Sequence, residues 1–164
     1  GFVRLIDRLH NRFGLRGILV GGPEEAPLRA EISGRLRSEA ILEVDTRSLS
    51  ELGSVVGHAR FYLGNDSGIM HIAEALGRRC IGLFGPTDER RNGPFRYWET
   101  VGTQPRHLIL RQVDLECSPC WTIHTVGKNP PCQFGDYRCL TAWDVDRIWG
   151  NVEDFVASVE SEPS

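Results

Sequence analysis

Residues 61–85, FYLGNDSGIMHIAEALGRRCIGLFG, predict a strand, a polar turn, a helix and a second strand. The helix that follows the turn carries apolar residues on one face, at Ile69, Ile72, Ala73 and Leu76. Gly77 is placed to end this helix as a left-handed cap, and residues 81–84 form the next buried strand. This order is the repeating unit of a parallel sheet covered by helices.

The turn at 64–68, Gly-Asn-Asp-Ser-Gly, holds the residues best suited to bind a ligand. We expect Asp66 or Ser67 to cap the helix with its side chain, so that the first N–H groups point outward at the positive end, where anions bind. Gly68 has no Cβ and would let a phosphate approach the backbone, while Asp66 and His71 project into the same space. An ordinary capped connection without a ligand is the alternative interpretation.

Apolar spacing along the rest of the chain continues the alternation of helices and strands. It predicts helices at about 2–13, 24–37, 48–58 and 144–160, and strands at 17–20, 40–44, 61–63 and 81–84. The second of these helices would bury Leu28, Ile32 and Leu36, and Ser48 with Glu51 forms a capping box. The predicted fold is therefore α/β, a Rossmann-like parallel sheet with helices on both faces.

Ligands of such sheets collect at the carboxyl ends of the strands, where this sequence carries GGPEE, NDSG and FGPTD. No strand leads into GxGxxG, which disfavours a dehydrogenase. Glu24 of GGPEE could accept hydrogen bonds from two ribose hydroxyls. It could equally be an acidic residue favoured by the helix dipole in a first turn.

Composition limits the class of protein. The 164 residues are 40% hydrophobic and 25% charged with a net charge of −3, as in a single soluble domain with its own core. Nothing indicates the basic face that nucleic-acid binding requires, and no apolar run is long enough to span a bilayer. The chain opens directly in a helical pattern, from which we expect a piece of a longer protein.

Residues 87–106 form a long polar stretch, and long loops in compact domains are often functional. Its basic and aromatic residues could contact an anionic, sugar-bearing acceptor: Arg90, Arg91, Phe95, Arg96, Tyr97 and Trp98. A solvated loop fixed by a few aromatic side chains is the alternative.

Four cysteines gather near the carboxyl end, at Cys117, Cys120, Cys132 and Cys139. The CSPC pair is a common chelating arrangement, so the four predict one tetrahedral zinc, two disulfides or packed free thiols. A reducing cytoplasm would favour zinc or free thiols over disulfides.

The order NDSGIMHIAEALG (65–77) then IGLFGPTD (81–88) resembles the signature of glycosyltransferase family 9, the heptosyltransferases of lipopolysaccharide core assembly. GGPEE (21–25), SLSEL (48–52) and the cysteine-rich tail (117–140) also fall in that family's order. The resemblance implies that residues 1–164 are the carboxyl-terminal, donor-binding lobe of a two-lobed GT-B enzyme. This lobe would include a cysteine-rich segment at 117–139 and a closing helix at about 144–160. The acceptor lobe would lie outside this chain.

The resemblance also implies the reaction and its partners. The donor would be ADP-L-glycero-D-manno-heptose and the acceptor lipid A–Kdo or a heptosylated core. Transfer would invert the anomeric centre and need no metal or other cofactor, any zinc at the cysteines being structural. The enzyme would be cytoplasmic, with at most peripheral association at the inner face of the inner membrane.

Residue by residue, the resemblance assigns Glu24 to the ribose, and Thr46 and Leu49 more weakly to the adenine. It assigns four residues to the heptose and diphosphate: Asp66, Ser67, Gly68 and His71. The general base would belong to the other lobe, so no catalytic residue is named here and this chain alone would be inactive. The alternatives are another nucleotide-sugar transferase or an epimerase on the same scaffold, and a non-catalytic interaction module with zinc-bound cysteines.

Overall fold

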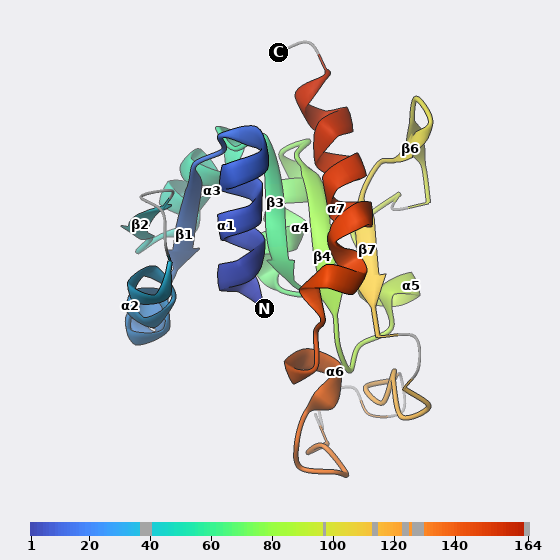
Figure 1. The fold of residues 1–164 in the computed structure, drawn as a ribbon. Helices are drawn as coiled ribbons and strands as arrows, with labels where there is room; N and C mark the ends of the chain where they lie inside the picture. Colours follow the sequence, from blue (N-terminus) through green and yellow to red (C-terminus); the bar gives the residue numbers. More distant parts are fainter. Residues whose placement is uncertain (37–40, 97, 113–114, 123–124, 126–129, 163–164) are drawn as a thin grey trace.

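A computed structural model of the chain describes residues 1–36, 41–96, 98–112, 115–122, 125 and 130–162 (Figure 1). In these ranges the helices are α1 (Phe2–Phe13), α2 (Ala26–Arg35), α3 (Leu49–Gly57), α4 (Gly68–Ala75), α5 (Glu89–Asn92), α6 (Arg138–Thr141) and α7 (Val145–Glu160), with a 3-10 turn η1 (Pro23–Glu25). The strands are β1 (Gly17–Gly21), β2 (Ile41–Asp45), β3 (Phe61–Asn65), β4 (Arg79–Phe84), β5 (Thr100–Val101), β6 (Gln104–Pro105) and β7 (Leu108–Arg111).

The long strands pair in parallel, as the alternating pattern predicts. β1 pairs with β2, and β4 lies between β3 and β7. Between described residues the hydrogen bonds form two parallel sheets rather than one continuous sheet, with β5 and β6 as a separate antiparallel hairpin. The arrowheads of β1, β3 and β7 point the same way in Figure 1, so the loops after these strands share one edge of the molecule.

Strand β4 forms the centre of the core, and every residue in it is buried. Side chains alternate along a strand, so Ile81 and Leu83 pack in one cluster with α1 and α7. Cys80 and Phe84 pack in a second cluster with α3 and α4. Helices therefore cover both faces, which confirms the predicted fold class.

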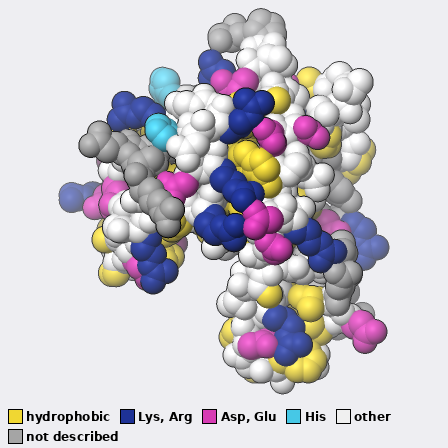
Figure 2. Space-filling view, viewed as in Figure 1, with side chains coloured by type: hydrophobic (Ala, Val, Ile, Leu, Met, Phe, Trp, Pro, Cys, Tyr) yellow, Lys and Arg dark blue, Asp and Glu magenta, His cyan; other side chains and the backbone are white. Residues whose placement is uncertain are grey.

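Helix α7 confirms the predicted closing helix, with six apolar residues buried along one side: Val145, Ile148, Val152, Phe155, Val156 and Val159. Its other contacts are polar. Arg4 and Arg8 of α1 pair with Asp146, and Arg12 pairs with Glu153 at 2.5 Å. Figure 2 shows the resulting mixture of basic and acidic side chains along this face of the molecule.

Helix α2 differs from its prediction. It begins after the 3-10 turn, and Leu28 is 56% exposed while Arg29 is only 4% exposed. The Arg29 guanidinium donates to the Gly22 carbonyl at 2.8 Å and pairs with Asp45. These contacts turn the helix so that a charged residue lies inside, which apolar periodicity cannot anticipate. Residues 37 and 40, at the predicted ends of this helix and the next strand, lie outside the described residues.

The stretch 87–106 is less irregular than expected, because it contains α5 and the β5–β6 hairpin. Phe95 and Trp98 are exposed and meet edge to face, with ring centroids 6.4 Å apart. Tyr97 lies outside the described residues. Within the described ranges, no helix combines the length and apolar composition needed to cross a membrane.

Candidate functional site

The turn between β3 and α4 leaves the amino-terminal end of α4 open. Ser67 occupies the N-cap position, but its side chain makes no capping hydrogen bond. The prediction that Asp66 or Ser67 caps the helix with its side chain is therefore wrong. The N–H of Met70 closes a tight turn onto the Ser67 carbonyl at 3.1 Å. By helix geometry the N–H groups of Gly68 and Ile69 point out of the helix end, as anion binding requires.

The Ser67 hydroxyl is held by Tyr62, which explains why it does not cap. The Tyr62 hydroxyl lies 3.2 Å from Ser67 Oγ and 3.4 Å from the Asn65 carbonyl oxygen. Burial raises the pKa of the Tyr62 phenol, so it stays protonated and can donate. The Tyr62 ring crosses the space that a Cβ at Gly64 would fill, so Gly64 is required for this close approach. Gly64 was predicted as part of the turn, but the contact of Tyr62 with this turn was not predicted.

Asp66 and His71 lie together beside the open helix end. His71 Nε2 is 3.8 Å from Asp66 Oδ1, and the His71 side chain is 47% exposed against 15% for Asp66. A Cβ built on Gly68 meets nothing within 4 Å, so the space above this backbone is open. The structure thus brings Asp66, Ser67, Gly68 and His71 into one site, as their spacing predicts.

A second group of polar residues lies at the carboxyl end of β1. A Cβ at Gly22 would collide with the Glu24 carboxylate, which folds back over this glycine. Glu25 accepts a hydrogen bond from the Gly22 N–H at 3.0 Å. The Thr46 N–H donates to the Gly21 carbonyl at 3.3 Å, so Thr46 lies beside the same loop. Within the described part of the chain, no hydrogen bond or ion pair joins this group to the Asp66 turn.

Leu49 begins α3 and is 77% exposed, so the structure places it on the surface rather than in a pocket. The capping box before it is confirmed in part. Ser48 accepts from the Glu51 N–H at 3.2 Å, but the Glu51 carboxylate accepts from the Arg47 N–H at 2.7 Å instead of from Ser48.

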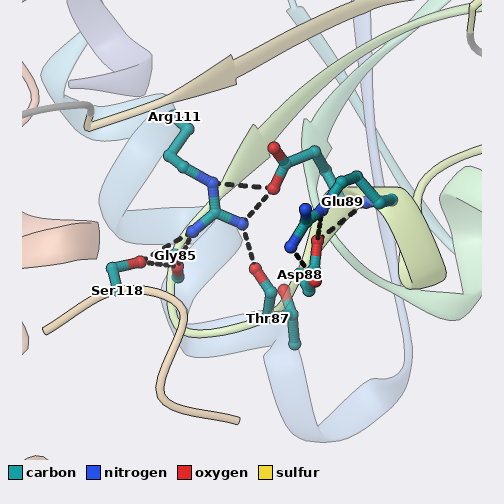
Figure 3. A network of polar contacts seen from close by, with 7 residues as sticks. Gly85, Thr87, Asp88, Glu89, Arg111 and Ser118 are labelled. Atoms are coloured by element: carbon teal, nitrogen blue, oxygen red, sulfur yellow. Dashed lines mark hydrogen bonds and ion pairs between the residues drawn. The ribbon is translucent and has the colours of Figure 1, made fainter. Parts of the chain in front are cut away.

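Arg111, at the carboxyl end of β7, organises a third loop at the same edge (Figure 3). Its guanidinium forms an ion pair with Glu89, with Nε donating at 2.7 Å, and also donates to the Gly85 and Thr87 carbonyls. It donates to Ser118 Oγ at 2.8 Å, and that hydroxyl donates to the Gly85 carbonyl at 2.7 Å. Arg111 therefore joins the FGPTD loop to the start of the cysteine segment.

The four clustered cysteines are free thiols that line one cavity of about 240 Å³ below the FGPTD loop. Among the described residues, no three His, Cys, Asp or Glu side chains already lie at metal-binding spacing. Backbone N–H groups, chiefly that of Phe134, hold the pKa of the Cys132 thiol below its usual range, whereas burial raises that of Cys139. Cys80 lies elsewhere, buried in β4, and burial raises its pKa to about 12.

The family model for glycosyltransferase family 9 (heptosyltransferase) matches residues 1–129. This chain belongs to glycosyltransferase family 9. The match includes all three loops at the carboxyl ends of the strands, and it stops within the cysteine segment.

Two curated family 9 relatives have recognisable sequence similarity. Lipopolysaccharide heptosyltransferase 3 of Escherichia coli is 34% identical over 90 residues, which cover 53% of this chain and 26% of the relative. Lipooligosaccharide heptosyltransferase 2 of Haemophilus influenzae is 30% identical over 87 residues, 51% of this chain and 25% of the relative. The matched part of this chain thus corresponds to about a quarter of their length.

Solved structures agree with the family 9 fold. A glycosyl transferase family 9 structure from Veillonella parvula superposes with a TM-score of 0.70 at 20% identity, over 96% of this chain and 40% of that one. The structure of E. coli ADP-heptose LPS heptosyltransferase II superposes with a TM-score of 0.58 at 22% identity, and the match covers 70% of this chain and 33% of that one. The structure of E. coli heptosyltransferase WaaC with ADP superposes with a TM-score of 0.58 at 19% identity, and the match covers 96% of this chain and 38% of that one. At these identities the likeness establishes the fold.

Two arginines of this family 9 chain position its loops and were not identified from sequence. Arg29 joins the GGPEE loop to the end of β2, and Arg111 joins the FGPTD loop to the cysteine segment. Arg29 directly follows Leu28, which was predicted to be buried, and Arg111 ends a strand that was not predicted. A single arginine after an apolar run is a weak signal, because most arginines are exposed.

Proposed function

We propose that this chain is the donor-binding lobe of an inverting heptosyltransferase that uses ADP-heptose to extend the lipopolysaccharide inner core. The family and the names of its relatives support a heptosyltransferase. The observation that carries the proposal is the open amino-terminal end of α4, with free space above Gly68 and Asp66 beside it. The acceptor lobe and the general base lie, on this proposal, outside residues 1–164.

The diphosphate of the donor would bind at the end of α4. The N–H groups there point toward the ligand, and the helix dipole favours negative charge. As ADP leaves, charge builds on the β-phosphate, and donors fixed in advance stabilise it better than reorienting water does. The chain itself supplies this stabilisation, so the proposal requires no metal at the diphosphate.

The sugar would lie against Asp66. A carboxylate repels phosphate but accepts strong hydrogen bonds from hydroxyl groups. His71 is half exposed beside it and can donate to a sugar hydroxyl or to a phosphate oxygen. Tyr62 fixes the turn through Ser67 and Asn65, so these groups are already in place before the donor binds.

The nucleoside would extend toward β1. The Glu24 carboxylate, folded over Gly22, would accept from the ribose hydroxyls, and Thr46 lies beside the same loop, with exposed Leu49 a weaker candidate for the adenine. On the proposal the acceptor is lipid A–Kdo or a heptosylated core. Its binding would place the enzyme in the cytoplasm at the inner face of the inner membrane.

Calorimetry with ADP tests the central assignment. The 164-residue chain should bind ADP yet transfer no heptose from ADP-heptose to a lipid A–Kdo acceptor. Gly68→Val should weaken ADP binding by about tenfold or more, equivalent to about 1.4 kcal/mol, because its side chain would occupy the phosphate's path. The fold itself leaves room for that side chain, since a Cβ there meets nothing.

Gly53→Val is the matched control, because Gly53 lies in α3 and its Cβ position is equally open. This variant should keep full ADP affinity. Equal ADP affinity in folded Gly68→Val and in the control would contradict the phosphate assignment. Heptose transfer by the purified chain would instead contradict the assignment of the base to another lobe.

A further inference from the structure

The segment 115–142 projects from the carboxyl edge of the sheet, away from the main core (Figure 1). Its described residues contain one four-residue helix, α6, and a single bridge between Thr87 and Trp121. Figure 2 shows hydrophobic and basic side chains together on this projection, and Phe134, Tyr137 and Leu140 are exposed. A segment this poor in secondary structure buries too little apolar surface to order itself, and small units of this kind usually need a covalent or metal cross-link.

The four cysteines lie where such a cross-link would act. Cys117 and Cys120 belong to the CSPC sequence, Cys132 follows it in the same segment, and Cys139 lies in α6. All four line the same cavity. Four thiols around one space form the donor set of a tetrahedral zinc site. Each thiol is free in the structure.

The surroundings of Cys132 suit a metal-bound thiolate. Backbone N–H groups of Phe134 and Tyr137 are directed at its sulfur, and the Gly135 N–H donates to the Cys132 carbonyl at 3.0 Å. Hydrogen bonds from backbone N–H groups to cysteine sulfur are a common second layer around metal–thiolate sites. Arg138 also lines the cavity and pairs at 2.8 Å with Asp136, whose carboxylate accepts from the Cys132 thiol at 4.0 Å.

We propose that Cys117, Cys120, Cys132 and Cys139 bind one Zn²⁺ that fixes the projecting segment beneath the FGPTD loop. Four thiols would release their protons to solvent and four S–Zn bonds of about 2.3 Å would form, giving a site of net charge −2. Tetrahedral geometry places the sulfurs about 3.8 Å apart, so the four thiols, of which no three lie at metal-binding spacing in the described structure, would draw together when the metal binds. A soft, four-coordinate cation fits this donor set, whereas Mg²⁺ and Ca²⁺ require oxygen ligands.

Direct contacts connect the proposed metal site to the loop after β4, at the edge of the sheet where the sugar donor is proposed to bind. The N–H groups of Cys120 and Trp121 donate to the Pro86 carbonyl at 2.9 and 2.8 Å. Ser118 links the same turn to Gly85 and Arg111. The loop after β4 is therefore held by one proposed ligand, Cys120, and by Ser118 and Trp121, which are next to ligands in the sequence.

Elemental analysis of the chain tests the site. After incubation with Zn²⁺ under reductant and removal of unbound metal, we expect about one zinc per chain. Cys117→Ser and Cys139→Ser should each weaken zinc binding by about tenfold or more, since three ligands hold a structural zinc poorly. The control is Cys80→Ala, a buried cysteine outside the cavity, which should retain the full zinc content.

Two further measurements keep the test decisive if a variant folds poorly. Co²⁺ added to the unaltered chain should give the intense visible absorption of a tetrahedral thiolate site, and Zn²⁺ should abolish it. Thiols of the denatured, unreduced chain are counted in the presence of a chelator. Five thiols together with bound zinc support the site. One thiol would mean two disulfides, and five thiols without metal would mean packed cysteines; either result overturns the proposal.

Discussion

At the scale of single residues, the role proposed for Asp66 follows from the roles that its carboxylate cannot fill. It is not the N-cap of α4, and its carboxylate lies 3.8 Å from His71 with 15% of its side chain exposed. A largely buried carboxylate that neither caps the helix nor can bind phosphate favourably is best used on hydroxyl groups. The proposal gives the ribose hydroxyls of ADP to Glu24, so Asp66 would contact the hydroxyls of the heptose.

We therefore expect Asp66→Ala, in the full-length enzyme, to weaken ADP-heptose binding and turnover about ten- to a hundredfold. This equals the loss of a charged hydrogen bond of roughly 1.5–3 kcal/mol. ADP affinity should change little, because ADP lacks the heptose. Calorimetry with both ligands, after circular dichroism shows that the variant is folded, makes the comparison. Equal losses for ADP and ADP-heptose would assign Asp66 a structural role.

At the scale of the elements, the end of β7 and the loop after β4 depend on a partly buried ion pair. The Arg111 side chain is 14% exposed and that of Glu89 is 26% exposed. The Arg111 guanidinium also donates hydrogen bonds to Gly85, Thr87 and Ser118 (Figure 3). Removing it leaves the Glu89 carboxylate and the Thr87 carbonyl without this donor, while the Gly85 carbonyl still accepts from Ser118. Leaving one partner of a partly buried pair uncompensated costs about 2–4 kcal/mol.

Arg111→Met should accordingly lower the free energy of unfolding in urea by about 2–4 kcal/mol. Hydrogen exchange at the Cys120 and Trp121 amides should also accelerate, since both donate to Pro86 in the same loop. Arg35→Met is the control, because Arg35 forms only an exposed pair with Glu31 within α2 and should cost under about 0.5 kcal/mol. Unchanged amide exchange in Arg111→Met would show that the loop is held by other contacts.

For the whole molecule, His107 links two strands of the central sheet and makes stability depend on pH. Its side chain is buried at 2% exposure, and Nδ1 accepts from the Cys80 N–H of β4 at 3.1 Å. Burial, with help from Arg106 and Arg79, lowers the pKa of His107 to about 4. In the unfolded chain the His107 imidazole binds a proton near its ordinary pKa of about 6.5. In the folded chain it stays neutral until the pH is much lower.

Stability from His107 is therefore fully present above about pH 6.5 and is lost as pH falls toward about 4, by up to about 3 kcal/mol. Urea unfolding measured at several pH values should show this slope. His107→Asn can still accept from Cys80 and should remove most of the slope between those limits. Identical pH dependence in the two proteins would exclude His107 as its source.

The sequence by itself determined the longer helices and most of the longer strands, and their order, but not β7 or the short elements after β4. Apolar spacing predicted α1, α7 and the strands β1, β3 and β4, because burial on one or both faces leaves a period in the chain. The turn 64–68 could also be predicted, because Gly, Asp and Ser strongly prefer turn conformations and here they follow a strand directly. These local rules were enough to bring Asp66, Ser67, Gly68 and His71 into one candidate site.

Tertiary structure alone decided which polar side chains hold the loops. Arg29 is buried and Leu28 exposed because two distant acceptors, Gly22 and Asp45, lie where α2 packs. Ser67 does not cap α4 because Tyr62 engages its hydroxyl. Such choices depend on partners far apart in sequence or on neighbouring strand residues, and each is worth about 1–3 kcal/mol. Periodicity averages over side chains and cannot register these individual contacts, so they become visible only when the strands and helices are assembled.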